Sequence, residues 1–175
     1  MRGVWIALLW LSCCAVIWAA DPPLQAFFGE YIGSTAEQDE PDRDLSVAIR
    51  PAADGDFQVQ WTTVIHRDDG RSKRKSYQIR FTPTARARIY ASAMRTNVFG
   101  GKSSLDPIQG EPLFWARIRG DTLTVNAFMI TDDGGYSMQI YNRTLSPKGL
   151  QLEYIRKNSD GSEVRIDAAL VRVAD

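Results

Sequence analysis

Residues 113–173 read LFWARIRGDTLTVNAFMITDDGGYSMQIYNRTLSPKGLQLEYIRKNSDGSEVRIDAALVRV, and this stretch decides the fold. Short runs of alternating apolar and polar residues follow one another, separated by Gly120-Asp121, Asp133-Gly134-Gly135, Pro147-Lys148-Gly149 and Asp160-Gly161. Alternation with a period of two is typical of strands with one buried face, and glycine accepts the positive φ angles of tight hairpin turns. Strands joined by tight turns pair only in the antiparallel sense, so this half of the chain predicts a meander.

The same alternation extends towards the N-terminus. Phe57, Val59 and Trp61 alternate with polar residues, and Asp69-Gly70 predicts a hairpin into the strand that contains Phe81. With further strands expected at residues 28–34, 45–50 and 87–93, the meander has about 8–10 strands. A sheet of this length exposes two edges unless it closes, so we expect an all-β, antiparallel up-and-down barrel in preference to a sandwich. We expect its interior to be shared by Trp61, Ile79, Val125 and Leu152.

The N-terminal segment has the layout of a secretory signal peptide. One positive charge at Arg2 precedes a largely apolar stretch, and the small residues Ala19 and Ala20 precede Asp21. We expect cleavage near these alanines, leaving one β-barrel domain over residues 21–175 in the periplasm or outside the cell. An uncleaved anchor, or a lipoprotein signal using Cys13 or Cys14, is the alternative.

Composition excludes several kinds of chemistry in the exported domain. Removing Arg2 from 21 basic and 21 acidic side chains leaves a net charge of −1, which gives no overall field for nucleic acid. Both cysteines fall in the signal, so the domain has no disulfide and no thiolate site, and a lone His66 cannot form a paired-histidine metal site. We therefore predict no metal and no cofactor.

Three connections are longer or more charged than tight turns. Residues 35–44 include five acidic side chains, but these lack the spacing of a calcium-binding loop. We therefore expect a solvated loop. The long segment of residues 95–112 has the length of a lid or binding loop. The hairpin tip at residues 67–75 is basic, and two interpretations are open. The tip either contacts an anionic surface or only keeps the protein soluble, and the residues concerned are Arg71, Lys73, Arg74 and Lys75.

Catalysis is not favoured by the sequence. His66 ends a strand without a serine in a nucleophile-elbow pattern, so an exposed, hydrogen-bonded histidine is expected. Glu153 and Asp167 fall on wet strand faces, where ion pairs with Arg165 or Lys157 are expected rather than acid–base chemistry.

Polar residues in phase with apolar ones are the more informative signal. Arg117 follows Leu113 and Trp115 at a period of two, Arg156 follows Leu152 and Tyr154, and Asn142 follows Met138 and Ile140 in the same way. An unpaired buried guanidinium is costly, so each arginine lies at a barrel rim, meets a buried partner or binds an anion.

Two short patterns resemble calycin barrels. Gly29-x-Tyr31 on the first strand, with Arg172 on the last, is similar to the lipocalin closure, in which a tryptophan at the aromatic position packs against a late arginine. Tyr154 and Arg156 resemble, in reversed order, the Arg–Tyr pair with which fatty-acid-binding barrels hold a carboxylate. The resemblance implies a cup with apolar walls and cationic groups for an acidic head.

The leading hypothesis is an exported binding protein for a small apolar or amphipathic ligand, acidic and lipid-like. The alternatives are an envelope protein-interaction module with a filled core, an enzyme using carboxylates or tyrosine, and an integral outer-membrane barrel, which the arginines in phase with the apolar face disfavour. The predicted ligand-binding residues are Trp61, Phe81, Trp115, Arg117, Met129, Met138, Tyr154 and Arg156.

Overall fold

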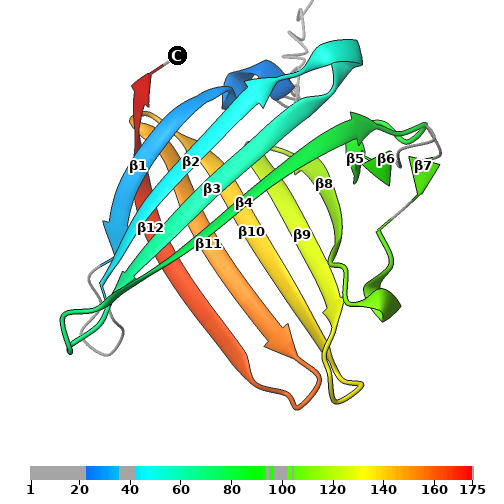
Figure 1. Ribbon diagram of the computed structural model, residues 1–175. Coiled ribbons are helices and arrows are strands. Elements are labelled where there is room, and N and C mark those ends of the chain that lie inside the picture. Colours follow the sequence, from blue (N-terminus) through cyan, green and yellow to red (C-terminus); the bar gives the residue numbers. More distant parts are fainter. Residues whose placement is uncertain (1–22, 36–41, 94, 97–101, 104, 175) are drawn as a thin grey trace, which may run out of the picture.

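The chain forms a closed antiparallel barrel of ten strands (Figure 1). The computed structural model describes residues 23–35, 42–93, 95–96, 102–103 and 105–174. The order around the barrel is β1-β12-β11-β10-β9-β8-β5-β4-β3-β2, so neighbours in sequence are neighbours in space except where β1 meets β12. The predicted all-β meander, and its closure into a barrel rather than a sandwich, are confirmed.

The barrel strands differ in length, and the shortest is β5. They are β1 (Gly29–Thr35), β2 (Arg43–Pro51), β3 (Phe57–His66), β4 (Ser72–Pro83), β5 (Ile89–Ser92), β8 (Leu113–Arg119), β9 (Thr122–Ile130), β10 (Tyr136–Ser146), β11 (Gly149–Asn158) and β12 (Glu163–Ala174). Outside the barrel, β6 (Arg95–Thr96) pairs with β7 (Lys102–Ser103). Three short 3-10 turns complete the described structure: η1 (Leu24–Phe27), η2 (Ala53–Gly55) and η3 (Pro107–Gln109).

Hairpin turns set which side chains face the interior. Gly134 adopts a φ of 81°, which only glycine takes easily, and the turn pairs Ile130 with Tyr136. The same register then pairs Val125 with Tyr141, and Tyr141 with Tyr154 on the next strand. Because directly paired residues share a face, the rings of Tyr141 and Tyr154 both point into the barrel.

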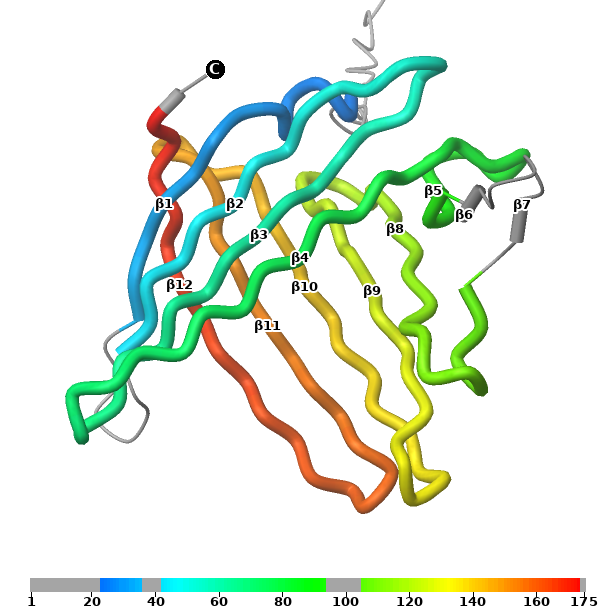
Figure 2. The backbone as a smooth tube through the Cα atoms, viewed as in Figure 1, coloured from blue at the N-terminus to red at the C-terminus, as the bar shows by residue number. Residues whose placement is uncertain are grey.

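An arginine–tyrosine contact closes the barrel between its first and last strands, which lie side by side in Figure 2. Tyr31 pairs with Arg172, whose guanidinium lies over the tyrosine ring at 5.1 Å and donates a 2.8 Å hydrogen bond to its hydroxyl. Arg172 also donates to the carbonyls of Phe28 and Ala26, and Tyr31 donates to the carbonyl of Phe27. This contact has the form that the calycin resemblance implies, with tyrosine in the place of tryptophan.

The two ends of the barrel interior differ. Near η1 the interior is packed with fully buried rings, and Phe57 stacks on Phe81 at 5.2 Å. The hairpins β3–β4 and β11–β12 lie at the opposite end from η1 (Figure 2). The strand segments near those hairpins carry polar and charged residues into the interior, so that end is where a site can form.

The interior phase predicted for β8 and β10 is wrong. Phe114, Ala116 and Ile118 face the core on β8, which places Trp115 and Arg117 on the outer wall. On β10, Tyr141 and Arg143 are buried inside, so Met138 and Asn142 point outwards. The outer face of this region is itself apolar, with Phe128 stacked on Tyr136 at 5.9 Å, and therefore hydrophobicity alone did not distinguish the two faces.

Several expectations lie outside the described residues. The signal peptide and its cleavage point fall within residues 1–22, and most of the acidic loop falls within residues 36–41. Residues 97–101 and 104 of the long segment at residues 95–112 are likewise not described, so the expected role of this segment as a lid or binding loop stays a prediction.

Candidate functional site

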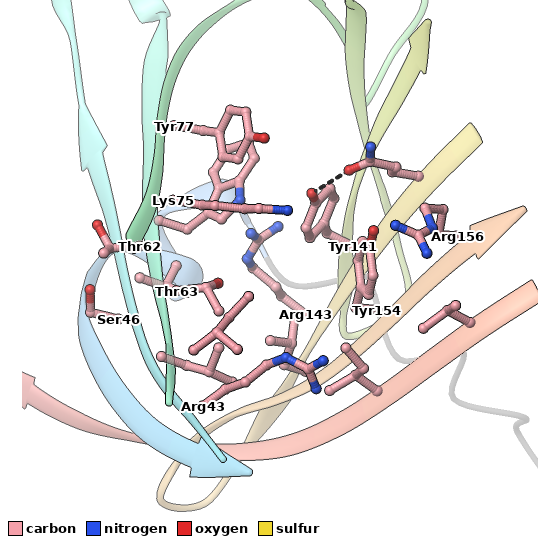
Figure 3. Close-up of a pocket in the computed structure, with 18 residues that line it drawn as sticks. Arg43, Ser46, Thr62, Thr63, Lys75, Tyr77, Tyr141, Arg143, Tyr154 and Arg156 are labelled. Atoms are coloured by element: carbon pink, nitrogen blue, oxygen red, sulfur yellow. Dashed lines mark hydrogen bonds between the residues drawn. The ribbon is translucent and has the colours of Figure 1, made fainter. Parts of the chain in front are cut away.

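A cavity of about 250 Å³ lies inside the barrel between two groups of strands (Figure 3). Strands β2, β3 and β4 form one wall, and β10, β11 and β12 form the other. Aliphatic side chains make up part of the lining: Leu45, Val47, Ile65, Leu152, Val164 and Ile166. Its polar side chains include Arg43, Lys75, Tyr77, Gln139, Tyr141, Arg143, Tyr154 and Arg156.

The cavity is strongly cationic. Four of its lining side chains are basic, namely Arg43, Lys75, Arg143 and Arg156, and none of the described residues that line it is an aspartate or glutamate. Lys75 is exposed whereas Arg143 is 1% exposed, so the positive charge extends from the protein surface into the barrel. Such an arrangement attracts anions and repels cations.

Arg143 is the central feature of this cavity. It lies on β10 opposite Leu123 and Leu152, and its guanidinium carbon is 5.4 Å from the ring centres of both Trp61 and Tyr141. Its Nε and Nη1 atoms are buried and have no hydrogen-bond partner among the described residues. Burial lowers the pKa of Arg143 to about 10, so the group is charged at neutral pH and its N–H groups lack an acceptor.

Four aromatic rings line the cavity in a continuous series. Trp61 lies 5.2 Å from Tyr77 and 5.1 Å from Tyr141, and Tyr141 lies 4.9 Å from Tyr154. Burial raises the pKa of the Tyr141 and Tyr154 hydroxyls, so both are neutral donors at physiological pH. Tyr141 uses its proton in a 2.8 Å hydrogen bond to Gln139.

Tyr154 and Arg156 lie on one face of β11, as the fatty-acid-binding resemblance implies. Both line the cavity, and burial raises the pKa of Tyr154 while the positive charge of Arg156 offsets only part of that rise. The Arg156 Nε is a further buried N–H without a partner among the described residues. An anion placed near Arg156 could therefore accept hydrogen bonds from both side chains.

Three other arginines of the barrel are paired. Arg80 binds Asp56 at 2.6 Å, Arg165 binds Glu153 at 2.5 Å, and Arg172 is held by carbonyls and Tyr31. Among the described residues, the buried guanidinium N–H groups without a partner belong to Arg143 and Arg156. This contrast distinguishes Arg143 and Arg156 from the three arginines that stabilise the wall.

The predicted ligand-binding residues divide between three locations. Trp61, Tyr154 and Arg156 line the cavity. Phe81 is buried in the packed end, and Met129 is in phase with the interior opposite Ser137 but does not line the cavity. The remaining three lie on the outer wall, where they cannot meet a ligand inside the barrel: Trp115, Arg117 and Met138.

Sequence reasoning missed Arg143 and Tyr141, because β10 was assigned the opposite phase. The hairpin register carries the signal that was needed. Val125 was expected inside, and a tight turn that pairs Ile130 with Tyr136 also pairs Val125 with Tyr141 and Leu123 with Arg143. Arg43 and Lys75 carry no comparable signal, since both lie beside loops and look like surface residues.

The other candidate polar residues lie outside the cavity. His66 is 46% exposed and its ring nitrogens contact Asp44 at 2.8 Å and Ser72 at 3.2 Å, which confirms an exposed, hydrogen-bonded histidine. On the outer wall Asn142 accepts from Thr124 and donates to Glu153, which also binds Arg165 as expected. This polar network therefore belongs to the wall of the barrel.

The described residues contain no group of three or more metal-ligating side chains. Among those same residues, no helix has the length and apolar character needed to cross a membrane. No family model, curated protein or solved structure matches the chain. The barrel is compatible with a calycin-like fold, and the function has to be argued from the cavity itself.

Proposed function

We propose that this chain is an exported binding protein for a small amphipathic organic acid, built on a calycin-like barrel. The observation that carries this proposal is the wholly buried Arg143, which lines the cavity and whose Nε and Nη1 atoms have no acceptor among the described residues. A protein that merely filled its core would place an apolar residue there, since an unsatisfied guanidinium destabilises the fold.

The remaining lining favours an amphipathic ligand over an inorganic anion. Aliphatic side chains such as Leu152, Val164 and Ile166 share the cavity with the rings of Trp61 and Tyr154. These surfaces favour hydrocarbon or an aromatic ring, while the arginines favour a carboxylate or similar group. The ligand therefore has an acidic part and an apolar part.

The size of the cavity narrows the ligand further. Its volume of about 250 Å³ lies at or below the small end of ligand pockets, which run from about 300 to 1,000 Å³. A short-chain or single-ring acid fits this space better than a long-chain lipid. We accordingly replace a general lipid-like ligand by a small organic acid.

Native mass spectrometry of the exported protein, followed by solvent extraction, tests the proposal. We expect a co-purifying acid, or uptake of added octanoate, and loss of this binding in Arg143→Gln. Arg119→Gln is the matched control, because Arg119 is an exposed arginine at the end of β8. If neither an endogenous acid nor octanoate nor benzoate binds, the carrier proposal fails and a filled-core interaction module becomes the better account.

Export and contact with an anionic surface remain proposals of the same kind. The hairpin β3–β4 carries Lys73 and Arg74 as exposed residues, whereas Arg71 is engaged by Asp69 at 2.6 Å. Lys75 both lies on this hairpin and lines the cavity. A basic edge beside the cavity would concentrate acidic ligands near the site.

A further inference from the structure

The strand register places Arg143 and Arg156 on opposite sides of the Tyr141–Tyr154 pair. Arg143 is opposite Leu152, whereas Arg156 is opposite Gln139, four residues further along β10. At 3.4 Å per residue the two Cα positions are about 14 Å apart along the sheet. The guanidinium groups therefore enter the cavity from two ends of one tyrosine-lined stretch, as Figure 3 shows.

Each of these two arginines needs an acceptor of its own. Within the part of the chain that the structure describes, Nε and Nη1 of Arg143 and Nε of Arg156 are buried without a partner. A single carboxylate held by Arg143 cannot also reach Arg156 across the tyrosine pair without leaving Nε and Nη1 of Arg143 unbound. No described carboxylate side chain lines the cavity to supply the second acceptor.

We propose that the ligand carries an anionic group at each end, as a linear dicarboxylate does. This inference rests on the proposed function and adds the number and the placement of the ligand's charges. One carboxylate accepts from Nε and Nη1 of Arg143, and the other accepts from Arg156 Nε and the Tyr154 hydroxyl. The apolar middle of the ligand lies across the rings of Tyr141 and Tyr154, which are in contact at 4.9 Å.

Matched acids that differ in one carboxylate test this inference by calorimetry at pH 7.5, where all carboxylates are ionised. Octanedioate and octanoate have the same chain length. We expect octanedioate to bind the intact protein at least about tenfold more tightly, the size of one added charge-assisted hydrogen bond. A series from butanedioate to decanedioate should pass through an affinity maximum, because both arginines are fixed on a rigid sheet.

Variants separate the two ends. Arg156→Gln should remove the advantage of octanedioate while changing octanoate affinity by less than about twofold, and Arg143→Gln should weaken both acids. Arg119→Gln, which removes an exposed charge outside the cavity, controls for the general positive field and should leave the preference for octanedioate in place. Circular dichroism and urea unfolding of each variant show that the barrel remains folded.

The outcomes distinguish this inference from the proposed function. Equal affinity of the two acids for the intact protein overturns the inference, and so does an equal loss of both acids in Arg156→Gln. A preference that Arg119→Gln removes as fully as Arg156→Gln also overturns it, because the general field would then account for it. In each of these cases the proposed function still holds if octanoate binds and its binding depends on Arg143. If neither of these acids nor any other organic acid binds, the proposed function and this inference both fail.

Discussion

Replacing Arg143 by methionine should stabilise the unliganded barrel and remove ligand binding. Two buried N–H groups without acceptors cost about 1–3 kcal/mol each, and contacts with the Trp61 and Tyr141 rings return about 0.5–2 kcal/mol each. The fall in the Arg143 pKa to about 10 corresponds to about 3 kcal/mol against the charged form. Methionine keeps an apolar contact with the rings, so we expect a gain of about 1–3 kcal/mol.

The pH dependence of this penalty has a definite sign. The folded-state pKa lies below the unfolded-state value, so the charged form is disfavoured in the folded protein at every pH below about 10. The penalty is therefore fully present at neutral pH and decreases only as the pH rises above about 10. Measurements at pH 7 should show the whole gain in Arg143→Met.

Urea unfolding followed by circular dichroism measures the effect. Arg143→Met should raise the midpoint without changing the slope, and calorimetry should show that octanoate binding is lost. Arg165→Met is the control, because Arg165 forms exposed ion pairs with Glu153 and Glu163 and should change stability by no more than about 1 kcal/mol. A loss of more than about 1 kcal/mol in Arg143→Met would refute the reasoning, since it would mean that Arg143 is already satisfied.

Four further predictions concern the closure, the tyrosines, a turn and the tryptophans. Tyr31→Phe removes the hydroxyl that joins Arg172 to the Phe27 carbonyl, and urea unfolding should show a loss of about 1–3 kcal/mol. Burial raises the pKa of Tyr141 and Tyr154 in the folded protein, so the hydroxyls lose their protons at lower pH in the unfolded chain than in the folded one. The free energy of unfolding should therefore fall above about pH 10, and urea unfolding at a series of pH values on both sides of 10 measures this fall. Gly149→Ala should cost more than about 1 kcal/mol, because φ is 151° and a Cβ would lie 2.3 Å from the Leu170 carbonyl oxygen, whereas Gly70→Ala meets no neighbour and should cost less in the same assay. Octanoate should change the fluorescence of Trp61, which lines the cavity, and Trp115→Phe on the outer wall should leave that change intact.

Turn chemistry and period-two alternation predicted most of the barrel correctly. The hairpins at Asp69-Gly70 and Asp160-Gly161 lie where the sequence placed them, with positive φ at both glycines. Trp61, Val125 and Leu152 share one interior as expected, and Ile79 packs against it. These features follow from local rules, since a tight turn fixes the pairing of its two strands and pairing fixes the faces.

The candidate site was predicted less well, because its location depends on which face of each strand is inside. On β10 both faces carry large apolar residues, for example Met138 outside and Tyr141 inside, so hydrophobicity did not decide the phase. A shift of one residue exchanges the inner and outer faces of a strand, and the phase expected for β10 put Arg143 on its outer face. The turn at Gly134 pairs Ile130 with Tyr136, and the same register pairs the buried Val125 with Tyr141. This pairing gives the correct inner face of β10.

Arg172 and Arg143 show how the two kinds of arginine in this barrel can be told apart. Each guanidinium lies over an aromatic ring, at 5.1 Å from Tyr31 for Arg172 and at 5.4 Å from Trp61 for Arg143. Arg172 also donates to two backbone carbonyls and a hydroxyl, so its burial is compensated within the fold. Arg143 has the ring contacts, but its Nε and Nη1 atoms have no acceptor among the described residues, which agrees with the proposed acidic ligand. Hydrogen-bond satisfaction, rather than burial or residue type, therefore separates Arg143 from Arg172.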